Sequence, residues 1–299
     1  MSTHSLTKAS LRAQGLPRRR AVNRLMEVLA WLAAAVGVAL LGIVVWSVAR
    51  RGAGALNLDL ITKAPSAAFS FTPVKQGLAN AFAGSLVIVA IATAMALPVG
   101  ILVAIYLNEF ALPSVRNAVS LVLDVLNGVP AIVIGIFVYG LLVVGHGQSG
   151  FAGSFALFCL MLPLVARSTM EVLALVPNSL REASLALGVA RWRTTLSIVL
   201  PQTIGGIVTG TVLAVARVAG ETAPLLFVSS LAGTAVSWDP HHALQSVPVA
   251  IFELAESPDP ADHTRAWAAA FVLLLFILVA GLGARWLATR SQRRISTSR

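Results

Sequence analysis

Long apolar blocks constrain this chain more than any other feature of its sequence. Six of them approach or exceed the length needed to cross the roughly 30 Å hydrocarbon core of a bilayer. They lie at Val28–Ala49, Ala81–Leu107, Val119–Val144, Phe151–Ala166, Ile204–Ser229 and Ala266–Leu287. Charged residues make up only 11% of the chain, against about 25% in a typical soluble domain. The pattern predicts an all-α integral membrane protein with six transmembrane helices.

The first apolar block has two possible interpretations. It is longer than the 7–15 residues of a signal-peptide core, although Ser47-Val48-Ala49 weakly resembles a cleavage site. Because Arg50 and Arg51 follow at once, we interpret Val28–Ala49 as an uncleaved anchor, preceded by a basic tail at 1–27.

The distribution of positive charge predicts the orientation. With the six blocks as spans, sixteen of the 22 lysines and arginines fall on the side of the N-terminus, five fall on the other side, and Arg217 lies inside the fifth span. Positively charged loops favour the cytoplasm. Both termini, including the basic tail at 288–299, are therefore predicted to be cytoplasmic. The net charge of +10 is explained by this topology and does not require nucleic acid as a partner.

The sequence carries no signature of catalysis or of metal binding. It has one cysteine, Cys159, and five histidines without metal-ligand spacing. None of the three lysines follows a glycine-rich phosphate loop, and neither HExxH nor GxSxG occurs. We expect no catalytic residue, no metal and no cofactor, so the chain is not predicted to be an enzyme or to bind ATP itself.

A charged stretch interrupts the apolar pattern between the fourth and fifth spans, on the predicted cytoplasmic side. Pro177 is expected to end the preceding helix. Ser179 and Glu182 have the spacing of a capping box, and Gly188 supplies a helix stop. These residues predict a helix of about two turns from Leu180 to Leu187.

One face of this short helix is formed by Leu180, Ala183, Ser184 and Leu187. Ala183 and Ser184 are small, so a partner backbone can approach closely there. Because an isolated two-turn helix is unstable in water, it must pack on lipid headgroups, on its own protein, or in the cleft of another protein. Local physics leaves these alternatives open.

The stretch resembles the EAA loop of ABC importer membrane subunits. Glu182-Ala183-Ser184, Gly188, Ile198 and Leu200-Pro201 occupy that family's spacing, with Ser184 replacing an alanine. The resemblance implies the type I (MetI-like) permease fold and a coupling loop at 178–201 that docks on a separate ATP-hydrolysing subunit. The residues it assigns to ATPase coupling are Ser179, Leu180, Glu182, Ala183, Ser184, Leu187 and Gly188.

Four further segments resemble phosphate-importer permeases of the PstA type. They are DVLNGVPAIVIG from Asp124, RVAGETAPLLF from Arg217, SVPVAIFELAESP in the predicted outer loop, and RAWAAAFVLLL in the last span. The resemblance implies a five-helix transmembrane domain at 78–287 and transport of inorganic phosphate. It also implies four kinds of partner: a second permease (PstC type), two ATP-binding subunits (PstB type), an extracytoplasmic phosphate-binding protein (PstS type), and membrane lipid.

Four polar residues are candidates for the substrate path. Arg217 and Glu221 are four residues apart, so we expect them on one face of the fifth helix. Charges inside a membrane usually face a polar path or pair with each other, so they either bind substrate or form a structural pair. Asp124 and Asn127 lie one turn apart in the third span and either line the path or are satisfied by neighbouring donors.

Two other functions remain as alternatives. The EAA loop alone equally fits a permease for sulfate, molybdate or phosphonate, and the GETAPLLF segment favours phosphate. A secondary transporter or channel is compatible with single intramembrane charges, but it would not need a coupling loop, and we find no inverted repeat.

Overall fold

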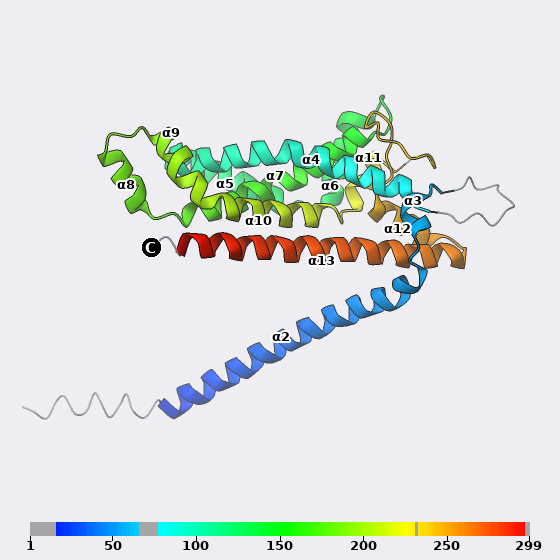
Figure 1. The fold of residues 1–299 in the computed structure, drawn as a ribbon, viewed down its shortest axis with the longest axis horizontal. Helices are drawn as coiled ribbons and strands as arrows, with labels where there is room; N and C mark the ends of the chain where they lie inside the picture. The colour runs from blue at the N-terminus through cyan, green and yellow to red at the C-terminus, as the bar shows by residue number, and fades with distance from the viewer. Residues whose placement is uncertain (1–15, 66–76, 231–232, 297–299) are drawn as a thin grey trace, which may run out of the picture. The chain divides into compact units, whose positions relative to one another are not determined.

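The computed structural model describes residues 16–65, 77–230 and 233–296, and in these residues the chain is helical, without strands (Figure 1). The helices are α2 (Leu16–Gly52), α3 (Leu58–Thr62), α4 (Ala79–Ile105), α5 (Pro113–Gly128), α6 (Ala131–Val138), α7 (Gly150–Ala174), α8 (Asn178–Ala186), α9 (Arg191–Thr194), α10 (Leu200–Val218), α11 (Ala223–Val228), α12 (Val247–Glu256) and α13 (Pro260–Ser296). A 3₁₀ turn η1 (Ala53–Ala55) and π-helical turns η2 (Tyr106–Phe110), η3 (Tyr139–Val143) and η4 (Thr195–Val199) extend several of them. The chain divides into two units, Met1–Arg50 and Arg51–Arg299, which we describe separately.

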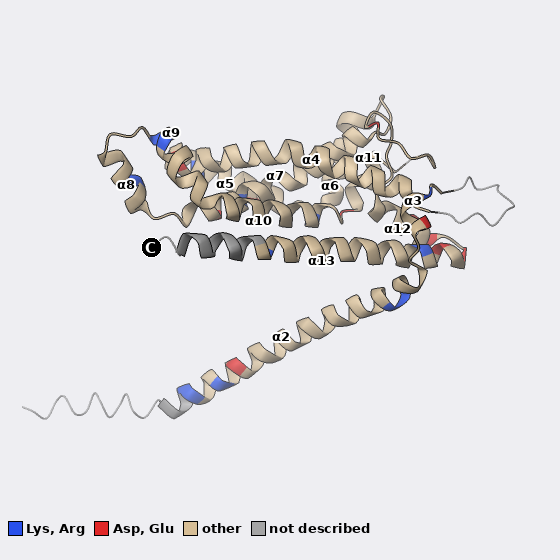
Figure 2. Ribbon diagram, in the orientation of Figure 1, with Lys and Arg blue, Asp and Glu red and all other residues tan. Residues whose placement is uncertain are grey.

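The first unit consists of α2, which contains the predicted first span. The helix begins at Leu16, well before the apolar block, because the basic segment is rich in arginine, leucine and alanine, all good helix formers. Its first turns carry Arg19, Arg20 and Arg24 (Figure 2). From Val28 to Ala49 the helix is apolar on all sides, as expected of a span in lipid.

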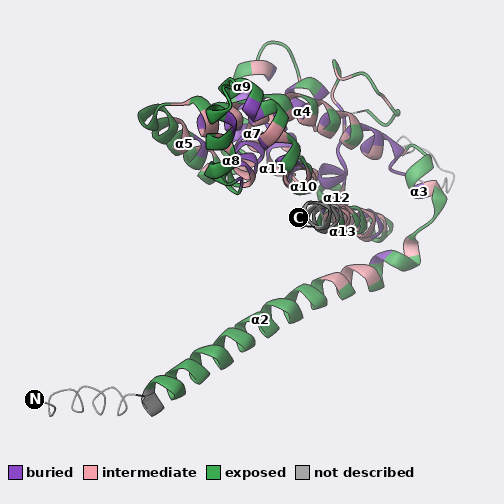
Figure 3. Ribbon diagram, turned by 60° about the vertical axis from the view of Figure 1, so that its left-hand side comes forward, coloured by how far each residue is buried: buried purple, intermediate pink, exposed green. Residues whose placement is uncertain are grey.

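The second unit is a bundle built around α7. This helix packs most extensively against α4 and next against α10, and its residues are the most buried of the candidate spans (Figure 3). Leu157, Met161 and Val165 of α7 are completely buried in the main apolar core. The prediction that this span ends at Ala166 is wrong, because the helix continues through Arg167 to Ala174.

Small residues allow the neighbouring helices to approach α7 closely. A Cβ atom added to Gly100 of α4 would lie 2.9 Å from a Val165 methyl carbon. A Cβ atom added to Gly206 of α10 would lie 2.5 Å from Cγ1 of Val172, and one added to Gly210 would lie 2.6 Å from Oγ of Ser168. Glycine is therefore required on both sides of α7 by close packing within the membrane.

The third predicted span is broken. Instead of one helix over Val119–Val144, α5 and the α6–η3 helix meet at an angle of 97°. The break falls at Gly128-Val129-Pro130, where Val129 is extended and Pro130 lacks an amide hydrogen. Pro98 and Pro163, by contrast, lie inside continuous helices.

The segment SVPVAIFELAESP of the predicted outer loop contains helix α12, which is not confined to the surface. Val247, Val249 and Ala250 are buried, and α12 packs on α13 and α4. The Ser246 hydroxyl caps its first turn, and the amide of Val247 donates to Ser85 of α4 at 2.8 Å. These bonds draw the apolar half of the loop into the bundle.

Among the described residues, five helices are long and apolar enough to cross a membrane, or six when α5 and α6–η3 count as one bent span. The long helices of the second unit lie side by side, with α8 and α9 at one end of the bundle and α3 and α12 at the other (Figure 1). We call these the α8 end and the α12 end.

Candidate functional site

The short helix in the charged stretch between α7 and α10 ends where the sequence predicts. Gly188 has a φ of +76°, in the left-handed region. Its amide donates to the carbonyl of Leu185 at 2.9 Å, and the amide of Val189 donates to Ser184 at 3.2 Å. This pair of bonds is the Schellman arrangement that ends a helix at glycine. The predicted stop at Gly188 is confirmed.

The predicted capping box is wrong. Helix α8 begins at Asn178, so Ser179 is inside its first turn, and Pro177 occupies the N-cap position without a side-chain cap. The backbone of Pro177 is extended, and its carbonyl accepts from Leu180 at 3.2 Å. The first turn therefore closes before Ser179 could cap it. Glu182 is exposed and is not bonded to Ser179.

The predicted face of α8 is divided between two environments. Ser184 is only 4% exposed, and its Oγ lies 2.8 Å from Thr194 Oγ1 of α9. Leu180 and Ala183 are exposed, and Leu187 is 84% exposed. Since Ser184 holds α8 onto α9, it is not part of the free surface. An apolar strip of Leu180, Ala183 and Leu187 remains available for a partner.

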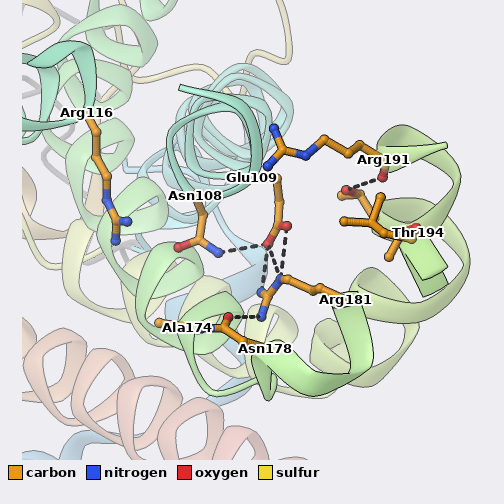
Figure 4. A pocket seen from close by; sticks show the side chains of 10 residues that line it. Asn108, Glu109, Arg116, Ala174, Asn178, Arg181, Arg191 and Thr194 are labelled. Atoms are coloured by element: carbon orange, nitrogen blue, oxygen red, sulfur yellow. Dashed lines mark hydrogen bonds and ion pairs between the residues drawn. The ribbon is translucent and has the colours of Figure 1, made fainter. Parts of the chain in front are cut away.

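Arg181 connects α8 to the bundle, a role that the sequence analysis missed. Its guanidinium makes a bidentate pair with Glu109 of η2, with Nη2–Oε1 at 2.8 Å and Nε–Oε2 at 3.1 Å (Figure 4). Nη1 donates to the carbonyl of Val176 at 2.6 Å, and Nη2 donates to that of Leu173 at 3.0 Å. One side chain thereby joins α8 to the C-terminal ends of α4 and α7.

The signal that could have revealed this pair was Glu109 itself. It is an acidic residue at the end of an apolar span, on the side where positive charge predominates. In the structure the Glu109 and Arg181 side chains are 9% and 17% exposed. A carboxylate buried to that degree requires a cationic partner.

The second candidate region is a crevice of about 60 Å³ between α5–α6, α7 and α10. Its wall includes three of the four predicted path residues, Asn127, Arg217 and Glu221. The rest of the lining is largely apolar, from Leu126, Val129, Ala131, Leu160, Leu164 and Val218. The structure therefore brings side chains of three spans together around one small cavity.

Arg217 and Glu221 do not share a helix face, contrary to the prediction. Helix α10 ends at Val218, where the amides of Gly220 and Glu221 donate to the carbonyls of Arg217 and Val218 at 3.2 and 3.1 Å. The chain resumes as α11 at Ala223, with Pro224 in its first turn. Within the described residues, Arg217 and Glu221 form no ion pair with each other. Both line the crevice because the helix breaks there.

Asp124 lies outside this crevice. It forms an ion pair with Arg167 of α7, whose Nη2 also donates to the carbonyl of Ser120 at 2.7 Å. The Asp124 side chain is 61% exposed. Of the two interpretations left open above, the structure favours a carboxylate satisfied by a neighbouring donor.

With this geometry in place, the chain can be compared with known proteins. Residues 96–296 match the family described as "Binding-protein-dependent transport system inner membrane component". The chain belongs to this family. The permease is 39% identical over 263 residues to the phosphate transport system permease protein PstA of Haemophilus influenzae, covering 87% of this chain and 91% of the relative. It is 40% identical over 223 residues to PstA 1 of Mycobacterium tuberculosis, covering 73% and 72% of the two chains.

Solved structures support the fold of the permease. A chain of the inward-facing MetNI methionine ABC transporter matches with a TM-score of 0.55 and 16% identity, over 71% of this chain and 93% of that one. A chain of a bacterial alginate ABC transporter in complex with its periplasmic protein matches with a TM-score of 0.57 and 14% identity, over 92% and 97%. The predicted MetI-like fold is confirmed, and the permease is a multi-pass membrane protein.

Proposed function

We propose that this permease is the membrane subunit of an ATP-driven importer of inorganic phosphate. One observation carries the proposal: the chain is 39% identical to a protein named as a phosphate permease and covers 91% of its length. The permease would form half of the translocation path, and a related PstC-type permease would form the other half. Two PstB-type subunits would bind and hydrolyse ATP, and a PstS-type protein would deliver phosphate.

The α8 region is suited to receive motion from an ATPase. The apolar strip Leu180, Ala183 and Leu187 is exposed at the tip of the bundle, while Ser184 and Arg181 fasten the other side of α8 to the protein. A push on the strip would therefore reach α4 and α7 through Arg181. In this proposal, closure of the ATPase pair shifts α8, and the bundle switches between its two access states.

The crevice residues are suited to a protonated oxyanion. The Arg217 guanidinium offers a planar fork of donors that matches phosphate oxygens. Near neutral pH phosphate retains at least one hydrogen, which the Glu221 carboxylate would accept. Sulfate has no hydrogen to donate, so Glu221 would repel it. The side-chain amide of Asn127 would add a neutral hydrogen-bonding group to the same cavity.

Transport in vesicles tests the function. The permease is co-purified with its PstC-type and PstB-type partners, reconstituted, and supplied with binding protein outside and ATP inside. We expect ATP-dependent uptake of labelled phosphate and little uptake of sulfate. Uptake of sulfate or molybdate as fast as that of phosphate would contradict selectivity for phosphate and favour an importer of another oxyanion. Phosphate uptake by the permease alone, driven by an ion gradient, would contradict the ATPase coupling and indicate a secondary transporter.

Arg217→Gln tests the path within the same assembly. Losing two charge-assisted hydrogen bonds, each worth about 1.5–3 kcal/mol, should lower the uptake rate at limiting phosphate by at least about a hundredfold. Co-purification of the partners should be unchanged. Arg285→Gln is the matched control, because Arg285 is an exposed arginine of α13 outside the crevice. Full uptake by Arg217→Gln would remove Arg217 from the path.

A further inference from the structure

A cavity of about 330 Å³ at the α8 end has no role in the function proposed above. It lies around the Glu109–Arg181 pair, between η2, the start of α5, the end of α7, α8 and α9 (Figure 4). The side chains that matter for its chemistry are those of Arg116, Arg181, Arg191, Glu109, Asn108 and Asn178.

The cavity carries an excess of positive charge. Three guanidinium groups and one carboxylate line it, and the carboxylate of Glu109 is taken by Arg181. Arg116 and Arg191 are exposed, and neither has a carboxylate partner within the described part of the chain. Figure 4 shows these two arginines on either side of the Glu109–Arg181 pair. Two positive charges therefore remain uncompensated in a concave, partly polar pocket.

The position of the cavity along the bundle indicates which anions can reach it. Glu109 lies in the last turn of one candidate span, Ala174 ends a second, and Arg191 begins a third. The cavity is therefore at the level where the spans leave the hydrocarbon core. This is the depth of the lipid phosphates, and it is also open to solutes in the adjoining water.

We propose that this cavity binds a phosphate group, attracted by the uncompensated charges of Arg116 and Arg191. Arginine forks match phosphate oxygens, and the amides of Asn108 and Asn178 supply neutral polar groups in the same wall. The group belongs either to an anionic lipid or to free inorganic phosphate. Because Asn178 is the first residue of α8 and Arg181 is its anchor, an occupant would lie against the base of α8.

Direct binding to the full-length chain tests the site without assuming any transport activity. The chain carries Arg217→Gln, so that the crevice does not contribute, and it is purified in a neutral detergent. One arm measures binding of inorganic phosphate by equilibrium dialysis. The other arm measures, by native mass spectrometry, retention of phosphatidylglycerol against phosphatidylcholine. Saturable phosphate binding identifies the free anion as the ligand, and selective retention of phosphatidylglycerol identifies the lipid.

Charge removal at the cavity distinguishes specific binding from general attraction. We expect Arg116→Gln with Arg191→Gln to weaken binding at least about tenfold, since each arginine contributes charge-assisted bonds. Each single variant should have an intermediate effect. Arg193→Gln is the matched control, because Arg193 is a neighbouring exposed arginine that lies over Trp192 and does not line the cavity. An unchanged melting temperature confirms that each variant is folded.

Three outcomes would overturn the inference. The first is that the chain binds neither probe. The second is that the double variant and Arg193→Gln bind equally well. The third is that binding disappears when the ATP-binding partners are present, since the two arginines would then be contacts for partner carboxylates. Each of these outcomes leaves the phosphate importer proposal intact, because that proposal is tested by uptake.

Discussion

At the scale of single residues, Arg181 uses its full hydrogen-bonding capacity. Its five N–H donors all have acceptors, in Glu109, Asn178, and the carbonyls of Leu173 and Val176. Arginine is suited to this position because its planar guanidinium is always charged and its donors point in fixed directions. Lysine could not satisfy the carboxylate and the helix C-terminus together.

Removing the two members of this pair should have unequal effects. Arg181→Ala leaves Glu109 buried with only the amide of Asn108 as a donor, so we expect a loss of about 3 kcal/mol in the free energy of unfolding. Glu109→Ala should cost less, because Arg181 keeps its carbonyl partners. The double variant should cost less than the sum of the singles.

Unfolding of the purified permease in mild detergent measures these differences. Arg193→Ala, in the same loop, should change the free energy of unfolding little, because its side chain is exposed. Additive effects of the two single substitutions, or a larger loss from Glu109→Ala, would contradict the argument.

At the scale of elements, the candidate substrate path coincides with interruptions of helices. The α5–α6 bend and the break between α10 and α11 both border the crevice. Polar backbone can be left outside a regular helix within a membrane only where protein or water covers it. Here α6 and α11 pack on each other beside the crevice.

The close approach of α6 and α11 depends on Gly135. A Cβ atom added there would lie 2.6 Å from the Cα atom of Pro224, which is backbone and cannot rotate away. Gly135→Ala should therefore separate the two helices, lower the melting temperature, and reduce uptake by tenfold or so, since misplacement near a site by about an ångström is costly.

Gly140→Ala is the control for this prediction. It lies in the same helical segment, and an added Cβ atom would meet no atom within 4 Å. Because alanine favours helix over glycine, Gly140→Ala should leave stability unchanged or slightly raised. If both variants behave alike, contact with Pro224 is not what requires glycine at position 135.

At the scale of the whole molecule, the two ends of the bundle differ in the charged residues that they carry. Arginines of α8 and α9 lie at one end, and the acidic residues of α12 and of the start of α13 lie at the other (Figure 2). By the positive-inside rule, the α8 end is predicted to face the cytoplasm, where ATP is available.

Cysteine labelling in intact cells tests this orientation. In a Cys159→Ala background, Thr234→Cys should react with a membrane-impermeant maleimide added outside, because Thr234 is exposed and belongs to the predicted outer loop. Ser179→Cys, which is also at an exposed position, should react only after the membrane is opened. The opposite pattern would invert the topology and separate α8 from ATP.

Some features of the charged segment between α7 and α10 follow from local sequence and others do not. The helix predicted at Leu180–Leu187 and its end at Gly188 follow from residues a few positions apart, and the structure has both, with α8 at Asn178–Ala186. The capping box was also a local inference, but it was wrong, because the extended Pro177 starts the helix earlier. The partner of Arg181 is 72 residues away in the chain, so the local pattern marks Glu109 as a carboxylate that needs a partner but does not say which residue supplies it.

What the sequence by itself determined is the membrane class, the positions of the apolar blocks, and the short helix that ends at Gly188, because each depends on apolar length or short-range spacing. The tertiary structure alone decided that Ser184 faces α9, that Asp124 pairs with Arg167, and that Arg217, Glu221 and Asn127 share one crevice. These arrangements depend on how α8 packs on α9 and on how α5, α7 and α10 bend and pack. Helix periodicity describes one helix at a time and contains no information on where two helices meet.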